Sequence, residues 1–128
     1  MAKCVLIVDD DEGVRDSLRQ YLEELGYQVV TAQNPGFCQA VSLESSCPLE
    51  NRCCDIIIID FSMPKMNGLD FLEGRANRLC KGSAIPAALM SGFLPEDGEK
   101  RLKDIGCTFF PKPVHFSTIL KWIESLPE

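Results

Sequence analysis

Residues 55–60 run Asp-Ile-Ile-Ile-Ile-Asp, four consecutive isoleucines between two aspartates. Isoleucine is β-branched and favours strands, and the absence of polar alternation indicates a strand that is covered on both faces. Residues 4–8, Cys-Val-Leu-Ile-Val, have the same character and are followed directly by three aspartates. Strands buried on both faces are typical of parallel sheets flanked by helices, so these two runs predict an α/β fold.

Helical patterns alternate with strand patterns along the rest of the chain. Gly26 predicts the end of a first helix, whose apolar residues recur at steps of three and four: Val14, Leu18, Tyr21, Leu22 and Leu25. Further strands are predicted at 27–32, 84–90 and 108–110, and further helices around 37–41, 69–79, 95–106 and 116–123. Five strands alternating with five helices imply parallel pairing through right-handed crossovers, with helices on both faces of an open sheet.

The segment 95–106 is mostly polar, and its predicted helix has few core anchors, chiefly Leu102 and Ile105. Acid-before-base pairs four residues apart favour a solvated helix there: Glu96 with Lys100, Asp97 with Arg101, and Glu99 with Lys103. Because so few residues anchor this helix, we expect it to shift at small cost.

The length and net charge of the chain limit the classes of function that it can have. The 128 residues suit a single domain spanning 1–128, and the net charge of −6 argues against direct nucleic-acid binding, which needs clustered cations. The apolar runs are too short to span a membrane, so we expect a cytoplasmic protein without membrane attachment. Seven cysteines without a CxxC motif, and one histidine, argue against a structural zinc site.

Polar residues follow four of the five predicted strands. Aspartates 9–11 follow the first, Asp60 ends the third, Ser91 ends the fourth, and Lys112 comes just after the fifth. The carboxyl ends of parallel strands meet at one edge of a sheet, so these side chains are expected to converge there. Clustered carboxylates repel one another unless a cation or protons arrive, and two or three carboxylates with a backbone carbonyl suit Mg²⁺.

A plainer interpretation of the acidic run remains open. Runs of acids are often solvated faces, and Asp11 has the residue type and position to cap the first helix, with Glu12 complementing its dipole. On this view only Asp9 and Asp10 face the sheet edge.

Four segments together resemble the receiver domain of two-component response regulators, of the chemotaxis-receiver kind. They are VLIVDDDEGVRDSL at 5–18, DIIIIDFSMPKMNG at 55–68, ALMSG at 88–92 and PKP at 111–113, and the likeness covers nearly the whole chain. The resemblance implies a flavodoxin-like (βα)5 three-layer sandwich, in which a parallel five-stranded sheet has the order 2-1-3-4-5.

The resemblance also implies roles for individual residues in phosphorylation. Asp60 would accept a phosphoryl group, Ser91 would hydrogen-bond the phosphoryl oxygens, and Lys112 would pair with the carboxylate or phosphoryl charge. The peptide bond between Lys112 and Pro113 would be cis. Phe109 occupies the position of the aromatic residue that switches when Ser91 moves, although it also suits an ordinary core position.

A metal site is implied at the same edge. Asp10 and Asp60 would bind Mg²⁺, or Mn²⁺, directly, Asp9 would act through a bound water, and Ser62 would contribute its backbone carbonyl. Ser62 and Phe93 stand where the lifetime of the phosphoryl group is set in such proteins. Phe93 is bulky for that position, and we hypothesise that it shields the acyl phosphate from water.

The leading functional hypothesis is a phosphorylation-dependent signalling switch that is not a turnover enzyme. Its partners would be a histidine kinase or histidine phosphotransfer protein and a downstream effector domain or protein. Its output surface would be formed by the fourth helix, the fifth strand and the fifth helix, with homodimerisation on phosphorylation possible. The alternatives are a Mg²⁺-dependent aspartyl-phosphate phosphatase of the haloacid dehalogenase kind and a receiver-fold module that acts without phosphorylation.

One feature of the sequence argues against the phosphatase, and another departs from the usual receiver pattern. The phosphatase family has a second acid two residues after its nucleophile, where this chain has Ser62. The segment from Ser46 to Cys54 is several residues longer than is usual in receivers, and it holds three cysteines. Its role, the identity of the kinase, and whether the chain acts alone or within a longer regulator stay open.

Overall fold

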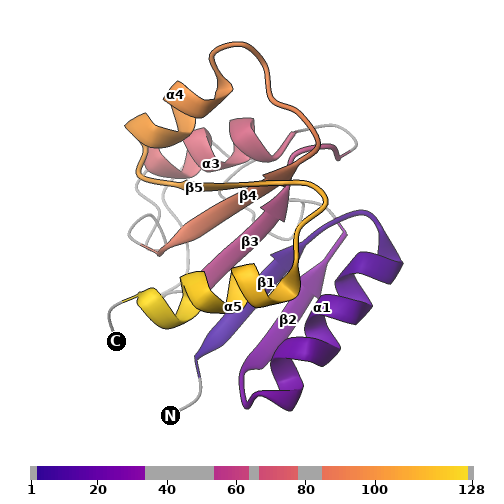
Figure 1. Cartoon of the computed structure of the whole chain (residues 1–128). Helices are drawn as coiled ribbons and strands as arrows, with labels where there is room; N and C mark the ends of the chain where they lie inside the picture. The colour runs from indigo at the N-terminus through magenta and orange to yellow at the C-terminus, as the bar shows by residue number, and fades with distance from the viewer. Residues whose placement is uncertain (1–2, 34–53, 64–66, 78–84, 127–128) are drawn as a thin grey trace.

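A computed structural model describes residues 3–33, 54–63, 67–77 and 85–126 (Figure 1). Five parallel strands form one sheet in the order β2-β1-β3-β4-β5, with the bounds Cys4–Val8 for β1, Gln28–Ala32 for β2, Ile56–Asp60 for β3, Ala87–Ser91 for β4 and Thr108–Pro111 for β5. The helices are α1 Glu12–Glu24, α3 Gly68–Asn77, α4 Gly98–Asp104 and α5 Phe116–Ser125. The predicted flavodoxin-like fold and strand order are confirmed.

The sheet has a separate core on each face, which is why its central strands are apolar without interruption. Ile57 and Ile59 of β3 point toward α3 and α4, where they join a buried cluster with Leu69 and Leu102. The alternate isoleucines of β3 point to the other face, where the cluster members from α1 and α5 are Leu18, Leu22, Ile119 and Ile123. Figure 1 shows these two pairs of helices on opposite sides of the sheet.

Helix α1 begins and ends where the sequence predicted. The carboxylate of Asp11 accepts hydrogen bonds from the backbone N–H groups of Gly13 and Val14, so Asp11 is the N-cap. Gly26, with φ of 96°, turns the chain away beyond the helix. The placement of Leu25 in the apolar stripe was wrong: Leu25 is the C-cap residue and is 50% exposed, because it lies past the last helical turn that faces the sheet.

Helix α4 is shorter than the polar pattern indicated, because it begins two residues after Glu96. The expected pair of Glu96 with Lys100 is therefore not a pair within the helix, and Lys100 lies 3.6 Å from Asp104 instead. The expected pair of Asp97 with Arg101 forms at 3.8 Å.

The remaining predictions concern the region 37–54, the edge strand of the sheet and the absence of a membrane-spanning helix. The helix around 37–41 and all of the 46–54 segment except Cys54 lie outside the described residues, and Cys54 itself is buried. Strand β5 is an edge strand, which accommodates Pro111 as expected. Among the helices that the structure describes, none has the length and apolar character needed to cross a membrane.

Candidate functional site

The carboxyl ends of the strands bring the expected polar residues to one edge of the sheet. Asp9 directly follows β1, Asp60 and Ser91 are the last residues of β3 and β4, and Lys112 directly follows β5. The strand register places Asp60 beside Met90, one residue before Ser91. We call this edge, with its three aspartates Asp9, Asp10 and Asp60, the acidic rim.

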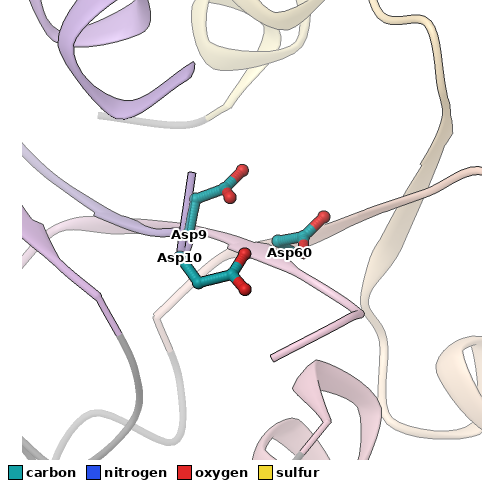
Figure 2. A group of neighbouring side chains, drawn as sticks. All are labelled: Asp9, Asp10 and Asp60. Carbon is teal, nitrogen blue, oxygen red and sulfur yellow. The ribbon is translucent and has the colours of Figure 1, made fainter. Parts of the chain in front are cut away.

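The three carboxylates of the acidic rim lie together, as Figure 2 shows. Each offers one oxygen, and these oxygens all lie within 4.8 Å of one another. Asp9 and Asp60 are buried, whereas Asp10 is exposed. Asp11 is not part of this group, because its carboxylate caps α1.

Asp9 carries an uncompensated buried oxygen. Its Oδ1 accepts a hydrogen bond of 2.9 Å from the backbone N–H of Asp11, but its Oδ2 is buried without a hydrogen-bond partner among the described residues. Burial raises the pKa of Asp9 above its ordinary value, and the charge of Asp60 adds to this, although the hydrogen bond from Asp11 opposes it. A buried, unpaired carboxylate oxygen beside two further carboxylates is a donor set that fits a hard divalent cation.

Lys112 supplies the positive charge of the site. Its Nζ lies 2.5 Å from Oδ1 of Asp60, and the peptide bond between Lys112 and Pro113 is cis, as predicted. Burial disfavours the charged ammonium group, but the hydrogen bond to Asp60 and the charge of Asp60 outweigh this, so the pKa of Lys112 is raised. The backbone N–H of Lys112 donates to the carbonyl of Ser91, which ties the end of β5 to the end of β4.

The second oxygen of Asp60 is also bonded. The backbone N–H of Ser62 donates to Oδ2 of Asp60 at 3.1 Å. Gly68 packs directly behind this turn: a Cβ atom there would lie 2.5 Å from the carbonyl oxygen of Asp60 and 2.6 Å from Cδ1 of Leu89. The Asn-Gly pair before a helix is the sequence signal that could have indicated a special backbone position at Gly68.

The Ser91 hydroxyl forms hydrogen bonds with the backbone of Phe93. The Ser91 hydroxyl is buried and donates to the carbonyl oxygen of Phe93, while the N–H of Phe93 donates back to the hydroxyl at 3.2 Å. The Phe93 side chain is 76% exposed and its ring centroid lies 6.5 Å from that of Phe61, the residue after Asp60. Phe93 therefore lies beside the acidic rim, and its shielding role stays a prediction.

Phe109 of β5 is half-buried and packs against the core cluster on the face covered by α3 and α4. It pairs in register with Leu89 of β4, two residues before Ser91. Its position is compatible with both interpretations, and its role as a switch stays a prediction.

A groove of about 740 Å³ lies next to Lys112, between α1 and α5. Its lining includes Val14 and Ser17 of α1, Pro113 and Val114 of the loop after β5, and Phe116 of α5. The groove gives an open, largely apolar surface beside the acidic rim.

A parallel sheet of this order, with carboxylates after β1 and at the end of β3, defines a flavodoxin-like α/β protein with an acidic site at its topological switch point. The sequence model of the response regulator receiver domain family matches residues 5–124. The chain belongs to this family, whose members are signalling domains of two-component systems.

Two curated relatives illustrate the range of the family. An uncharacterised 14.6 kDa protein from the sodA1 3' region of Leptolyngbya boryana is 31% identical over 121 residues, covering 94% of this chain and 86% of that protein. The transcriptional regulatory protein PdtaR of Mycobacterium tuberculosis H37Rv is 29% identical over 121 residues, and the match covers 94% of this chain but 54% of PdtaR.

Solved structures show the same fold. The non-phosphorylated HemR receiver domain from Leptospira biflexa has a TM-score of 0.77 and 26% identity, with 98% of this chain and 97% of that chain covered. The chemotaxis response regulator CheY4 of Vibrio cholerae has a TM-score of 0.74 and 25% identity, with 97% of this chain and 98% of that chain covered.

Proposed function

We propose that this chain is the phosphoacceptor of a two-component phosphorelay and that Asp60 accepts the phosphoryl group. One observation carries the proposal: Asp60 is buried at the end of β3 with the ammonium group of Lys112 on one oxygen and two further aspartates beside it. A carboxylate held in this way can attack phosphorus and form an acyl phosphate. The proposed donor is a phosphohistidine of a histidine kinase or histidine phosphotransfer protein, and membership of the receiver-domain family supports this.

The proposed reaction transfers a phosphoryl group from the donor's histidine to Asp60. An oxygen of Asp60 forms a bond to phosphorus while the bond from phosphorus to the donor's imidazole nitrogen breaks, and the imidazole leaves with the electron pair. Lys112 neutralises charge on the phosphoryl oxygens, which is supported by its raised pKa and its contact with Asp60. Ser91 has to exchange its hydrogen bond to the Phe93 carbonyl for one to a phosphoryl oxygen.

The acidic rim is proposed to hold Mg²⁺, or Mn²⁺, during this reaction. Asp10 and Asp60 would bind it directly, the backbone carbonyl of Ser62 would complete the protein ligands, and Asp9 would act through a bound water. When bound, Mg²⁺ supplies positive charge to the oxygens of the transferring group. The unpaired Oδ2 of Asp9 supports this proposal, since a cation with its waters would satisfy that oxygen.

The proposed output follows from the new charge on Asp60. An acyl phosphate carries about two negative charges where the carboxylate carried one, and it draws Ser91 toward it. Movement of Ser91 would release Phe109 and shift the surface of α4, β5 and α5, which a downstream effector domain or protein, or a second copy of the chain, would recognise. Ser62 and Phe93, beside Asp60, would set the lifetime of the phosphoryl group.

The position of Ser62 favours a receiver over a phosphatase of the haloacid dehalogenase kind. That family needs a second acid two residues after the nucleophile, and here Ser62 contributes its backbone N–H to Asp60 instead. The proposed chemistry is therefore limited to phosphorylation and dephosphorylation of Asp60 itself.

Intact mass spectrometry after incubation with MgCl₂ and phosphoramidate tests the proposal. We expect the mass of one phosphoryl group to be added to the wild-type chain and none to Asp60→Asn. Asp55→Asn is the matched control, because Asp55 stands at the opposite end of the same isoleucine run and an asparagine oxygen can still accept its hydrogen bond from the N–H of Cys4. An adduct that persists in Asp60→Asn would place the phosphoryl group on another residue and refute the role of Asp60. No adduct on the wild type would also refute the proposal, and would favour a module that acts without phosphorylation.

A further inference from the structure

Arg15 of α1 reaches back to the acidic rim. Its Nη1 donates a hydrogen bond of 2.8 Å to the backbone carbonyl oxygen of Asp9, six residues earlier in the chain. The side chain is half-buried, and the guanidinium contacts main chain at this point, so the carboxylates of the rim stay available to other partners.

The hydrogen bond from Arg15 completes a set that immobilises Asp9. The backbone N–H of Asp9 donates to the carbonyl of Ala32 at 3.0 Å, and Oδ1 of Asp9 accepts from the N–H of Asp11 at 2.9 Å. The strand pairing of β1 ends at Val8, and among the described residues Arg15 donates a hydrogen bond to the Asp9 carbonyl. Within the part of the chain that the structure describes, the bond from Arg15 holds this carbonyl, and with it the plane of the peptide between Asp9 and Asp10.

Asp10 depends on that peptide for its direction. Its carboxylate is exposed, and in the part of the chain that the structure describes no hydrogen bond or ion pair holds it. The backbone that carries Asp10 consequently sets the direction of its Cα–Cβ bond, and with it the positions that the carboxylate can reach by rotation about χ1 and χ2. A ligand whose backbone is held in place loses less conformational freedom when it binds a metal.

We propose that Arg15 is a positioning residue for the divalent cation: its hydrogen bond to the Asp9 carbonyl aims the Asp10 carboxylate at the metal position. This inference rests on the proposed metal site of the acidic rim. Among the described residues, the side-chain hydrogen bond of Arg15 goes to the Asp9 carbonyl and not to a carboxylate of the acidic rim, so the proposed effect passes through the peptide of Asp9.

The sign of the effect separates positioning from simple electrostatics. A guanidinium charge near the rim repels a divalent cation, so removal of that charge alone would strengthen Mg²⁺ binding. Loss of positioning has the opposite effect and weakens Mg²⁺ binding. A variant without the charge and without the donor therefore gives opposite results under the two explanations.

Isothermal titration of the full chain with MgCl₂ at constant ionic strength measures this difference. For Arg15→Met we expect the Kd for Mg²⁺ to rise about tenfold, the effect typical of lost outer partners of metal ligands. Arg15→Lys keeps the charge but has a shorter side chain, and for this variant we expect the Kd for Mg²⁺ to rise at least about twofold. Arg19→Met is the matched control: Arg19 lies one turn further along α1, pairs with Asp16 and Glu23, and should leave the Kd unchanged.

The outcomes are distinguishable. If the wild type binds no Mg²⁺, the proposed metal site itself fails. If the wild type binds Mg²⁺ and Arg15→Met, shown to be folded by circular dichroism, binds it equally or more tightly, the role of Arg15 is refuted. Should Arg15→Met not fold, a wild-type Kd in Arg15→Lys refutes it.

Phosphorylation kinetics add a second measurement. At saturating Mg²⁺ we expect Arg15→Met to be phosphorylated on Asp60 at close to the wild-type rate, because Arg15 acts on metal affinity alone. A rate that stays about tenfold lower at saturating Mg²⁺ contradicts the proposal, since Arg15 would then take part in the chemistry.

Discussion

Asp9 of the acidic rim has a buried carboxylate that lowers the stability of the folded chain. Its carboxylate is fully buried, one of its oxygens has no hydrogen-bond partner among the described residues, and the Asp60 charge lies close by. Such a group destabilises the folded chain unless a cation is present. Its raised pKa means that the folded chain takes up a proton at a higher pH than the unfolded chain does.

Asp9→Asn is therefore expected to stabilise the metal-free protein at pH 7. The amide oxygen keeps the hydrogen bond from Asp11 while the buried charge is removed, which should raise the free energy of unfolding by about 1 kcal/mol. Because the pKa of Asp9 is raised, the gain should shrink as the pH falls through that pKa toward the ordinary value of 3.8. Urea unfolding in EDTA measures this, and a variant less stable than the wild type at pH 7 would contradict it.

Gly68 contributes to the same site by having no side chain. Gly68→Ala should lower the free energy of unfolding by about 2 kcal/mol or more, since its Cβ would lie 2.5 Å from the Asp60 carbonyl oxygen and 2.6 Å from Cδ1 of Leu89. Gly92→Ala is the control, because a Cβ at Gly92 meets no atom within 4 Å and should change stability little. Equal effects of the two variants in urea unfolding would show that the close approach at Gly68 is not what matters.

At the scale of elements, α4 is held to α3 by an ion pair between side chains of the two helices. Arg101 donates through Nε to Glu73 at 3.0 Å and through Nη2 to the other oxygen of Glu73, and Nη2 also contacts Asp70 at 3.1 Å. Leu102, 1% exposed, is the apolar anchor beside it. The expectation of a solvated helix with few core anchors is confirmed, since Leu102 is the buried apolar side chain of α4, and Arg101 adds contacts to the neighbouring helix beside its pair with Asp97.

The pair between Glu73 and Arg101 should contribute about 1 kcal/mol to stability at pH 7, as a bidentate but partly exposed pair. Glu73→Gln removes this contribution. The hydrogen bond from Arg101 lowers the pKa of Glu73, so the contribution is present above the ordinary value of 4.5 and is lost as the pH falls through the lowered pKa.

Urea unfolding of the wild type and Glu73→Gln across pH 7 to 3 measures the effect, and the difference between the two should decrease below pH 4.5. Lys100→Met is the control: the Lys100 and Asp104 side chains are 80% and 61% exposed, and their pair should contribute almost nothing. A difference for Glu73→Gln that grows with acid would contradict the assignment.

At the scale of the whole molecule, the carboxyl edge of the sheet brings together residues from the ends of β1, β3, β4 and β5. A ligand that binds only this assembled edge stabilises the entire fold, because the unfolded chain does not hold the carboxylates together. Binding of Mg²⁺ is therefore expected to be visible as global stabilisation.

Thermal unfolding should show a higher Tm in MgCl₂ than in NaCl of the same ionic strength. At about one hundred times the Kd, the stabilisation expected from linkage is about 2.7 kcal/mol. Asp10→Asn should lose most of this increase, since it removes a proposed direct ligand without burying any new group. An equal increase of Tm in the wild type and in Asp10→Asn would place the cation elsewhere.

Patterns local to the chain were sufficient for much of the fold. The isoleucine run at 55–60 predicted a strand buried on both faces, the step of three and four residues predicted α1, and Asp11 and Gly26 marked its ends. The topological rule for parallel sheets then brought Asp9, Asp60 and Lys112 to one edge. These features follow from the periodicity of strands and helices, which nearby residues encode.

Contacts across elements were decided only in the tertiary structure. Arg101 pairs with Glu73, 28 residues away, in addition to its neighbour Asp97. The carbonyl held by Arg15 belongs to Asp9, and the atoms behind Gly68 belong to Asp60 and Leu89. Sequence spacing does not contain these distances, because they depend on how the helices pack against the sheet. By itself the sequence determined which residues reach the acidic rim. Packing decided which of their atoms are bonded and which oxygen of Asp9 has no hydrogen-bond partner among the described residues.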